Sequence, residues 1–187
     1  MTQPETSPTK VAVLLPGTGY TAQAPLLYWC GALLREAGWH VEVVEWTVTD
    51  EDIENPVPFV EYAVTAAFAA AFTAAPQATT RLIVAKSFGT FALPWAIENG
   101  VPGVWLTPIL TDPTVSGALA SANASHLAVG GSNDPMWVPE NAEGTDASLA
   151  TLDGGDHRLE VDAGWQASLD AQYDLLERIA VHIAKLA

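Results

Sequence analysis

The segment Arg81-Leu-Ile-Val-Ala-Lys-Ser-Phe-Gly89 decides the fold, because it joins an apolar run to a small-x-Ser-x-small pentapeptide. The run 81–84 has the composition of a buried strand, and the residues from Phe88 onward predict a helix. A sharp turn from strand to helix would lift the Ser87 hydroxyl clear of the sheet, and such a turn needs small residues on both sides of the serine. Ala85 stands where the commoner pattern has glycine. A serine at a helix N-cap would give the same local pattern.

Asp134 and His157 follow this serine in the sequence, and their order favours the sharp strand-to-helix turn over the helix N-cap. Asp134 follows the apolar run 126–130, and His157 follows the run 147–152. In an open parallel sheet the carboxyl ends of the strands form one edge, so side chains that are far apart in sequence converge there. We therefore predict that Ser87 is a nucleophile, that His157 is its general base and that Asp134 orients the base.

Predicted strands and helices alternate along the whole chain. The strands are expected at residues 10–15, 41–46, 81–84, 101–107, 126–130 and 147–152. The helices are expected at about residues 24–37, 60–74, 88–98, 135–141 and 163–186, and residues 111–122 are expected to form a short helix or an irregular crossover. The acidic stretch 50–58 is expected to lead into the second helix. Such alternation predicts an α/β fold with three layers, in which helices cover both faces of a parallel sheet.

With these features the sequence resembles the α/β-hydrolase family, in a compact form without a lid domain. The resemblance rests on Ala85-Lys-Ser-Phe-Gly89, Gly130-Gly-Ser-Asn-Asp134, Asp156-His157 and the early loop Leu15-Pro-Gly-Thr-Gly19. It implies a mostly parallel six-stranded sheet in the order 2-1-3-4-5-6, without the antiparallel leading pair of larger members. It also implies an oxyanion hole formed by the backbone N–H of Phe88 and by that of Thr18 or Gly19.

Several residues compete for these roles. Asp112 is a rival for the acid, because some family members place it after the fourth strand. Lys86 could form a Ser–Lys dyad, act electrostatically or make a structural ion pair, and the dyad would leave His157 idle. The remaining histidines are expected to be structural or solvent-facing, and Asp153 and Asp156 are expected to shape the turn around His157; these histidines are His40, His126 and His182.

The residues around the predicted site suggest the kind of substrate. The candidates for substrate binding are apolar or aromatic side chains in the expected loops, namely Tyr20, Ile109, Leu110, Met136 and Trp137. They favour a short acyl, aromatic or otherwise uncharged substrate. The absence of a long insertion before Asp134 argues against a lid, and hence against a lipase gated by an oil interface.

Composition sets wider limits on the function. The chain has 187 residues, of which 49% are hydrophobic, so we expect one domain over residues 10–187 behind a disordered tail, residues 1–9. Its 7 basic and 22 acidic residues give a net charge of −15, which disfavours nucleic acids and anionic membranes as partners. No apolar run approaches the roughly 18 residues of a membrane span, so we expect a soluble, cytoplasmic monomer or homodimer. The single cysteine, Cys30, excludes an intrachain disulfide and is expected to be buried.

No metal-ligand cluster or complete nucleotide-binding loop is visible, so we expect no metal and no cofactor. The sequence therefore predicts a serine hydrolase that cleaves a small carboxylic ester or thioester through an acyl-enzyme. An acyltransferase or amidase with the same three residues, and a catalytically silent binding protein, remain as alternatives.

Overall fold

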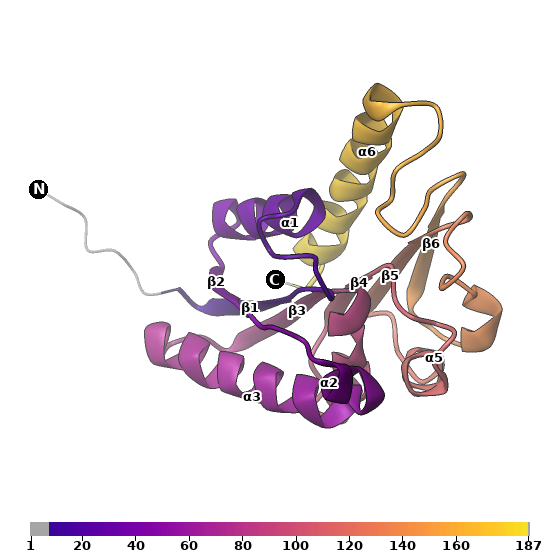
Figure 1. The fold of residues 1–187 in the computed structure, drawn as a ribbon. Helices are drawn as coiled ribbons and strands as arrows, with labels where there is room; N and C mark the ends of the chain where they lie inside the picture. Colours follow the sequence, from indigo (N-terminus) through magenta and orange to yellow (C-terminus); the bar gives the residue numbers. More distant parts are fainter. Residues whose placement is uncertain (1–7, 187) are drawn as a thin grey trace, which may run out of the picture.

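The computed structural model describes residues 8–186, so most of the predicted tail, residues 1–7, lies outside the described residues. Six strands form one sheet in the order β2-β1-β3-β4-β5-β6, and every pair of neighbours is parallel (Figure 1). The strands are β1 (Lys10–Leu15), β2 (His40–Val43), β3 (Thr80–Lys86), β4 (Gly103–Leu106), β5 (His126–Gly131) and β6 (Ser148–Leu152). The predicted strand order is confirmed.

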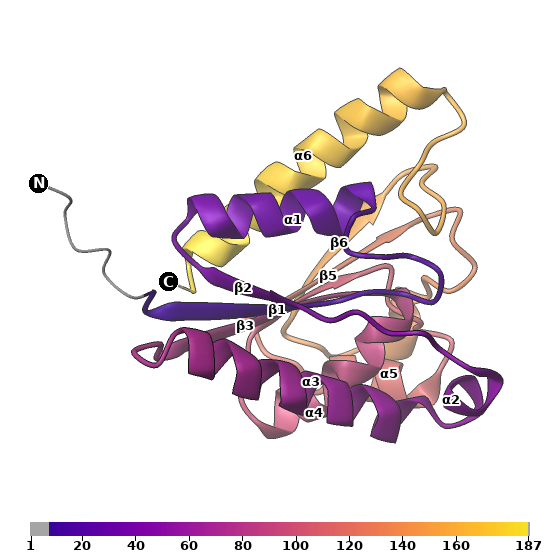
Figure 2. The ribbon, with the colours of Figure 1, turned by 60° about the vertical axis from the view of Figure 1, so that its left-hand side comes forward.

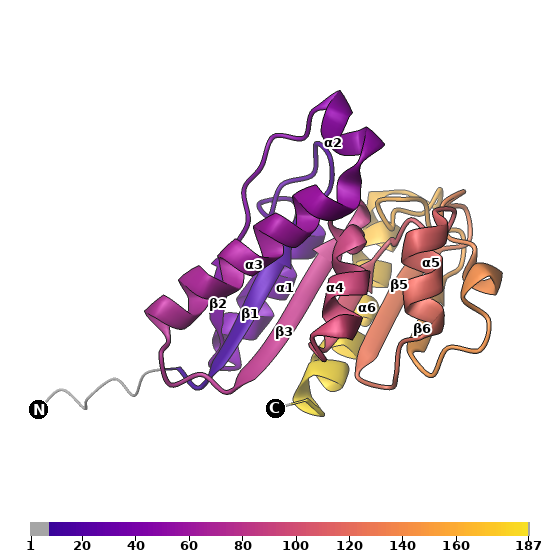
Figure 3. The ribbon, with the colours of Figure 1, turned by 90° about the horizontal axis from the view of Figure 1, so that it is seen from below.

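Helices cover both faces of this sheet (Figure 2). One face carries α1 (Pro25–Glu36) and α6 (Trp165–Ala184), which contact each other. The other carries α3 (Pro56–Ala74), α4 (Leu93–Glu98) and α5 (Pro113–Ala120), which lie side by side in Figure 3. The predicted three-layer architecture is therefore confirmed.

The alternation of side chains along the central strands divides the apolar core into two clusters. Val13 and Ile83 belong to the cluster beneath α3, α4 and α5. Leu14 and Val84, one residue further on, belong to the cluster beneath α1 and α6. Cys30 of α1 is fully buried in the second cluster, as predicted, and burial raises the pKa of its thiol to about 12.

The segment between β2 and α3 differs from the prediction. Strand β2 ends at Val43, and the acidic stretch contains a short helix, α2 (Asp50–Glu54). Thr49 caps α2 through a capping box, in which its hydroxyl accepts from the N–H of Asp52 and the Asp52 carboxylate accepts from the N–H of Thr49. Helix α3 then starts at Pro56, earlier than predicted, because proline fits the first turn of a helix, where its missing N–H costs nothing.

Two of the predicted helices are partly or wholly 3₁₀ helices, which are wound more tightly than α-helices. The helix after the serine starts as the 3₁₀ helix η1 (Ser87–Ala92) and becomes α-helical only in α4. Pro94 has no N–H for the carbonyl of Thr90, which instead accepts from Leu93, three residues on. The helix expected at 135–141 is the short 3₁₀ helix η2 (Pro139–Ala142).

The expectation that no apolar segment approaches the length of a membrane span is wrong for helix α3. Among residues 8–186 it is long and apolar enough, by length and composition alone, to cross a membrane, with a mean hydropathy of 1.4. A helix that packs in the core of a protein passes the same test. In this structure α3 lies along the sheet, and Val60, Val64, Phe68 and Ala71 on one side of it are in the core.

Candidate active site

Ser87 lies directly after β3, at the carboxyl edge of the sheet, and has a left-handed backbone with φ of 51°. This conformation is uncommon for a residue other than glycine. The chain must turn sharply here, and a Cβ on Gly89 would lie 2.6 Å from the carbonyl oxygen of Leu15. Ala85 is fully buried in the core cluster beneath α3, α4 and α5. Packing against β1 therefore explains why glycine is needed at position 89, and the core explains the small side chain at position 85.

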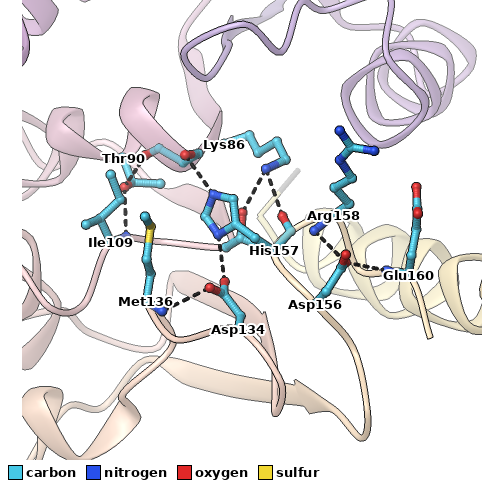
Figure 4. Close-up of polar contacts among 11 residues, drawn as sticks. Lys86, Thr90, Ile109, Asp134, Met136, Asp156, His157, Arg158 and Glu160 are labelled. Carbon is cyan, nitrogen blue, oxygen red and sulfur yellow. Dashed lines mark hydrogen bonds and ion pairs between the residues drawn. The ribbon is translucent and has the colours of Figure 1, made fainter. Parts of the chain in front are cut away.

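The structure brings Ser87, His157 and Asp134 together in one chain of hydrogen bonds. Figure 4 shows the His157 ring directed at the Asp134 carboxylate. Ser87 Oγ is 2.9 Å from His157 Nε2, and His157 Nδ1 is 2.7 Å from Asp134 Oδ2. A carboxylate only accepts, so Nδ1 carries the proton and donates to Asp134, while Nε2 accepts from the serine hydroxyl. The Asp134 side chain is fully buried, and its other oxygen accepts from the N–H of Met136 at 2.9 Å. The His157 side chain is 31% exposed.

Close packing between two loops places the histidine over the aspartate. A Cβ on Gly131, at the end of β5, would lie 2.0 Å from the carbonyl oxygen of Gly155, so only glycine permits this approach. The same carbonyl accepts from the N–H of Asn133 at 2.9 Å. Asp156 shapes the turn after His157, as expected, because its Oδ1 accepts from the N–H groups of residues 158 and 160.

Asp112, the rival for the acid, has a different role. It is the N-cap of α5, and its Oδ1 accepts from the N–H of Thr114 at 2.8 Å. The carboxylate that bonds to His157 is that of Asp134. The remaining histidines lie away from Ser87. His126 is buried against Trp105, and His182 bonds to the carbonyl oxygen of Ser125.

The early glycine loop lies against the end of β3, next to Ser87. A Cβ on Gly17 would lie 3.1 Å from the Cβ of Ser87. Gly17 and Tyr20 exchange two backbone hydrogen bonds, so their N–H groups are occupied, and Thr18 and Gly19 form the tip of the turn between them. Phe88 lies in the first turn of η1, where backbone N–H groups have no acceptor within the helix. The N–H groups of Phe88 and of Thr18 or Gly19 are the ones that were predicted to face a developing negative charge.

Lys86 is buried, which sequence reasoning did not foresee. Only 1% of its surface is exposed, and its Nζ donates to Thr107 Oγ1 and to the carbonyl oxygen of His157, both at 3.0 Å. Its ammonium is thus engaged with groups other than the hydroxyl of Ser87. Thr107, which follows β4 with a left-handed φ of 44°, also went unnoticed in the sequence. A buried lysine next to a nucleophile has no distinguishing sequence pattern.

The predicted substrate residues divide into two groups. Leu110 is fully buried and Trp137 is 6% exposed, and both belong to the apolar core in this structure. The Trp137 ring packs where a Cβ on Gly130 would lie, at 2.1 Å from that position. Met136 is 38% exposed, and Tyr20 and Ile109 are partly exposed.

A hollow of about 510 Å³ borders the glycine loop, between residues 16–23 and residues 44–47. Gly17 and Tyr20 line it on one side, and Glu45 and Trp46 line it on the other. Sequence reasoning missed the latter two, because they lie past the end of a strand that the prediction made too long. A larger hollow of about 690 Å³ lies between α1 and α6, and neither hollow is lined by Ser87, His157 or Asp134. Within residues 8–186, no three His, Cys, Asp or Glu side chains gather in a way that could hold a metal ion.

The fold has well-matched counterparts among solved structures. A protein from Xanthomonas campestris described as an α/β serine hydrolase without lid aligns with a TM-score of 0.69 and 13% identity, over 98% of this chain and 85% of its own. Dienelactone hydrolase from Anabaena variabilis aligns with a TM-score of 0.70 and 16% identity, over 96% of this chain and 87% of its own. An esterase from Pyrococcus furiosus aligns with a TM-score of 0.69 and 12% identity, over 96% and 84%.

No protein-family model matches the sequence, and no curated protein is similar to it in sequence. At this level of identity the structural likeness concerns the fold. The chain has the compact α/β-hydrolase fold, with a six-stranded parallel sheet and helices on both faces.

Proposed function

We propose that this protein is a serine hydrolase that cleaves small carboxylic esters or thioesters, with Ser87, His157 and Asp134 as its catalytic triad. The observation that carries the proposal is the hydrogen-bonded chain from Ser87 Oγ through His157 to Asp134, at 2.9 and 2.7 Å. Its position at the carboxyl edge of the sheet, on a left-handed serine after β3, also supports it.

The chemistry follows from this geometry. Ser87 Oγ attacks the acyl carbon while its proton passes to His157 Nε2, and Asp134 stabilises the imidazolium that results. The carbonyl oxygen becomes an oxyanion, for which the N–H of Phe88 and that of Thr18 or Gly19 are the proposed donors. The alcohol or thiol leaves with the proton from His157, and the acyl group stays on Ser87. Water then attacks the acyl-enzyme, His157 takes its proton, and the acid and free serine are released.

Three observations support an uncharged small-molecule substrate. A hollow of about 510 Å³, in the range of small-molecule sites, is lined by Gly17, where an added Cβ would lie 3.1 Å from Ser87 Cβ, although Ser87, His157 and Asp134 do not line it. Tyr20 and Trp46 give it aromatic walls. The His157 side chain is 31% exposed, so a substrate reaches the site without first displacing a cover. An esterase and dienelactone hydrolase among the structures with this fold agree with such a substrate.

Pre-steady-state hydrolysis of p-nitrophenyl acetate tests the proposal. The wild-type protein should release a burst of nitrophenol equivalent to the enzyme, followed by slower turnover, and the intact mass should show one acetyl group. Ser87→Ala should show neither. A folded wild-type protein that neither hydrolyses the ester nor becomes acetylated would instead support a silent binding protein. Acetyl transfer to an added alcohol or amine in preference to water would support an acyltransferase.

A further inference from the structure

Lys86 brings a positive charge into the interior beside the nucleophile. It is the last residue of β3, and the alternation of the strand puts it on the α1 and α6 side of the sheet, as it does Leu82 and Val84. Its side chain is 1% exposed. A buried ammonium costs folding free energy unless partners compensate for the lost hydration. The partners of Lys86 therefore indicate what it does.

These partners come from three different loops at the site. Nζ donates to the carbonyl oxygen of His157 and to Thr107 Oγ1, both at 3.0 Å (Figure 4). It also lies 4.6 Å from the centroid of the Tyr20 ring, within the range of a cation–π contact. Tyr20 closes the glycine loop that contacts Ser87. One ammonium thus joins the loop of the base, the loop after β4 and the glycine loop to the strand that ends at the nucleophile.

Burial, more than the surrounding charges, makes this contact responsive to pH. Burial lowers the pKa of the Lys86 ammonium to about 8, the carboxylates of Asp134 and Asp156 oppose this shift, and Arg158 adds to it. His157, Tyr20 and the hydroxyl of Thr107 are the other polar groups that face it. Near neutral pH the ammonium is mostly charged, so its hydrogen bonds to the two oxygens are charge-assisted.

We propose that Lys86 is a positioning residue, which fixes the loop of His157 and the glycine loop against the strand that carries Ser87. The proposal rests on the proposed function. The carbonyl of His157 belongs to the same residue as the imidazole, so a shift of this backbone moves Nε2 away from Ser87 Oγ. The attack requires that distance to stay within hydrogen-bond reach, and a displacement of about 1 Å can lower a rate by about 10²-fold.

Lys10 supplies a matched control at the opposite edge of the sheet. Its Nζ donates to the carbonyl oxygen of Ala37 at 2.9 Å and lies 5.3 Å from the centroid of the Trp39 ring. These are the same two kinds of contact, with partners far from Ser87. Methionine keeps most of the length of a lysine side chain but removes the charge and the donors. Comparison of Lys86→Met with Lys10→Met therefore separates the effect of the ammonium beside Ser87 from the general effect of removing a lysine that makes these contacts.

The experiment measures ester hydrolysis and the proton NMR spectrum of both variants. Lys86→Met should lower kcat by about 10- to 100-fold with KM changed by less than about threefold, and Lys10→Met should change neither by more than about twofold. The downfield resonance of the His157 Nδ1 proton should be sharp in the wild type and in Lys10→Met and broadened or lost in Lys86→Met. Unchanged kcat with an unchanged resonance in Lys86→Met overturns the proposal. A raised KM with unchanged kcat also overturns it, because it would place Lys86 in substrate binding.

The NMR readout needs no substrate, which separates this proposal from the proposed function. If the wild type hydrolyses no ester, the proposed function fails, and the His157 resonance still decides whether Lys86 holds the loop. If Lys86→Met does not fold, Thr107→Val serves as the second variant, because it removes one acceptor of the ammonium and leaves the lysine in place. That variant should broaden the same resonance and lower kcat about 3- to 10-fold, and an unchanged spectrum and kcat would overturn the proposal.

Discussion

Lys86 and Lys10 make similar contacts at opposite edges of one sheet, yet the contacts join different parts of the molecule. Lys10 is partly exposed, and it ties the start of β1 to the turn between α1 and β2 through Ala37 and Trp39. Lys86 is buried, and it ties together loops that surround Ser87. The first arrangement closes a turn. The second joins the loops around Ser87, the proposed nucleophile, and requires a buried charge.

The amino and carboxyl edges of the sheet also differ in their other polar residues. At the amino edge His126 accepts from Trp105 Nε1 at 3.2 Å and packs against its ring, so both polar atoms are satisfied within the core. At the carboxyl edge Ser87 and Thr107 have left-handed backbones, with φ of 51° and 44°. Strain of this kind costs about 1 kcal/mol or more per residue and is concentrated at functional sites. Changes at the carboxyl edge should therefore affect activity first, and changes at the amino edge should affect stability first.

The largest expected effect comes from removal of the nucleophile or the base. Ser87→Ala and His157→Ala should each lower kcat/KM by at least about 10³-fold, and the double variant should be scarcely worse, because the two residues act as one proton-transfer unit. Steady-state hydrolysis of p-nitrophenyl acetate measures this. His182→Gln, at the amino edge, is the matched histidine control and should keep kcat/KM within about twofold. Substantial hydrolysis by purified Ser87→Ala would disprove the assignment of the nucleophile.

Substitution of the two aspartates should separate a catalytic acid from a helix cap. Asp134→Asn should lower kcat/KM by at least about 10²-fold, because an amide cannot hold His157 in the required tautomer. Asp112→Asn should have little effect on activity or stability, because asparagine caps a helix about as well as aspartate. Kinetics and urea unfolding of both variants provide the comparison. The reverse ranking in kcat/KM would assign the acid to the loop after β4.

The charge of Lys86 should appear in the pH dependence of stability. Its pKa is about 8 in the folded protein and 10.5 ordinarily, so the unfolded chain binds more protons between these values. The free energy of unfolding of the wild type relative to Lys86→Met should therefore rise as pH increases from 8 to 10.5, by up to about 3 kcal/mol. Urea titrations at several pH values measure this difference. A difference that is flat or falls over this window would show that the ammonium is not disfavoured by burial.

His126 should give a signature of the same sign at acid pH, where stability again rises with pH. Burial, with a smaller effect from His182, lowers the pKa of His126 from 6.5 to about 4. The unfolded state binds more protons in that window, so the wild type should lose up to about 3 kcal/mol as pH falls from 6.5 to 4. His126→Phe should lose less over the same window, and its kcat/KM at neutral pH should stay close to that of the wild type. A variant with normal stability but strongly impaired kcat would contradict the division between the two edges.

The smallest effect concerns acyl chain length. The hollow of about 510 Å³ is open to solvent, so the far end of a long acyl chain would remain in water. Each methylene that is buried contributes about 0.8 kcal/mol, and one that remains in water contributes almost nothing. In a series of nitrophenyl esters, kcat/KM should therefore be highest for short acyl chains and should show no jump above the solubility limit. A preference for long chains would reveal an acyl tunnel.

The sheet could be predicted from the sequence because its central strands, β1, β3, β4 and β5, contain short apolar runs that alternate with helical patterns. Parallel strands connected in this way also fix which edge carries Ser87, Asp134 and His157. The end of β2 and the short helix α2 were missed, because the capping box at Thr49 and the proline at position 56 are local signals within a segment that composition marks as a loop. Each of these two local signals stabilises its helix only slightly, and neither changes the hydrophobic periodicity of the segment.

Tertiary packing decides what could not be predicted. Leu110 and Trp137 are near the site in sequence, but their side chains turn into the core, where Trp137 fills the space above Gly130. Lys86 is polar by composition, and only the joint positions of Thr107 and the His157 carbonyl make its burial possible. Loops that are separate in sequence supply these groups, so no spacing rule indicates them.

Labelling with a fluorophosphonate probe, followed by identification of the modified peptide by mass spectrometry, tests the central claim most directly. The wild-type protein and Lys10→Met should be labelled rapidly at Ser87, whereas Ser87→Ala should not be labelled and His157→Ala should react at least about 10²-fold more slowly. A folded wild-type protein that stays unlabelled, or that is labelled at a different residue, would contradict the assignment of an activated serine to the carboxyl edge of the sheet.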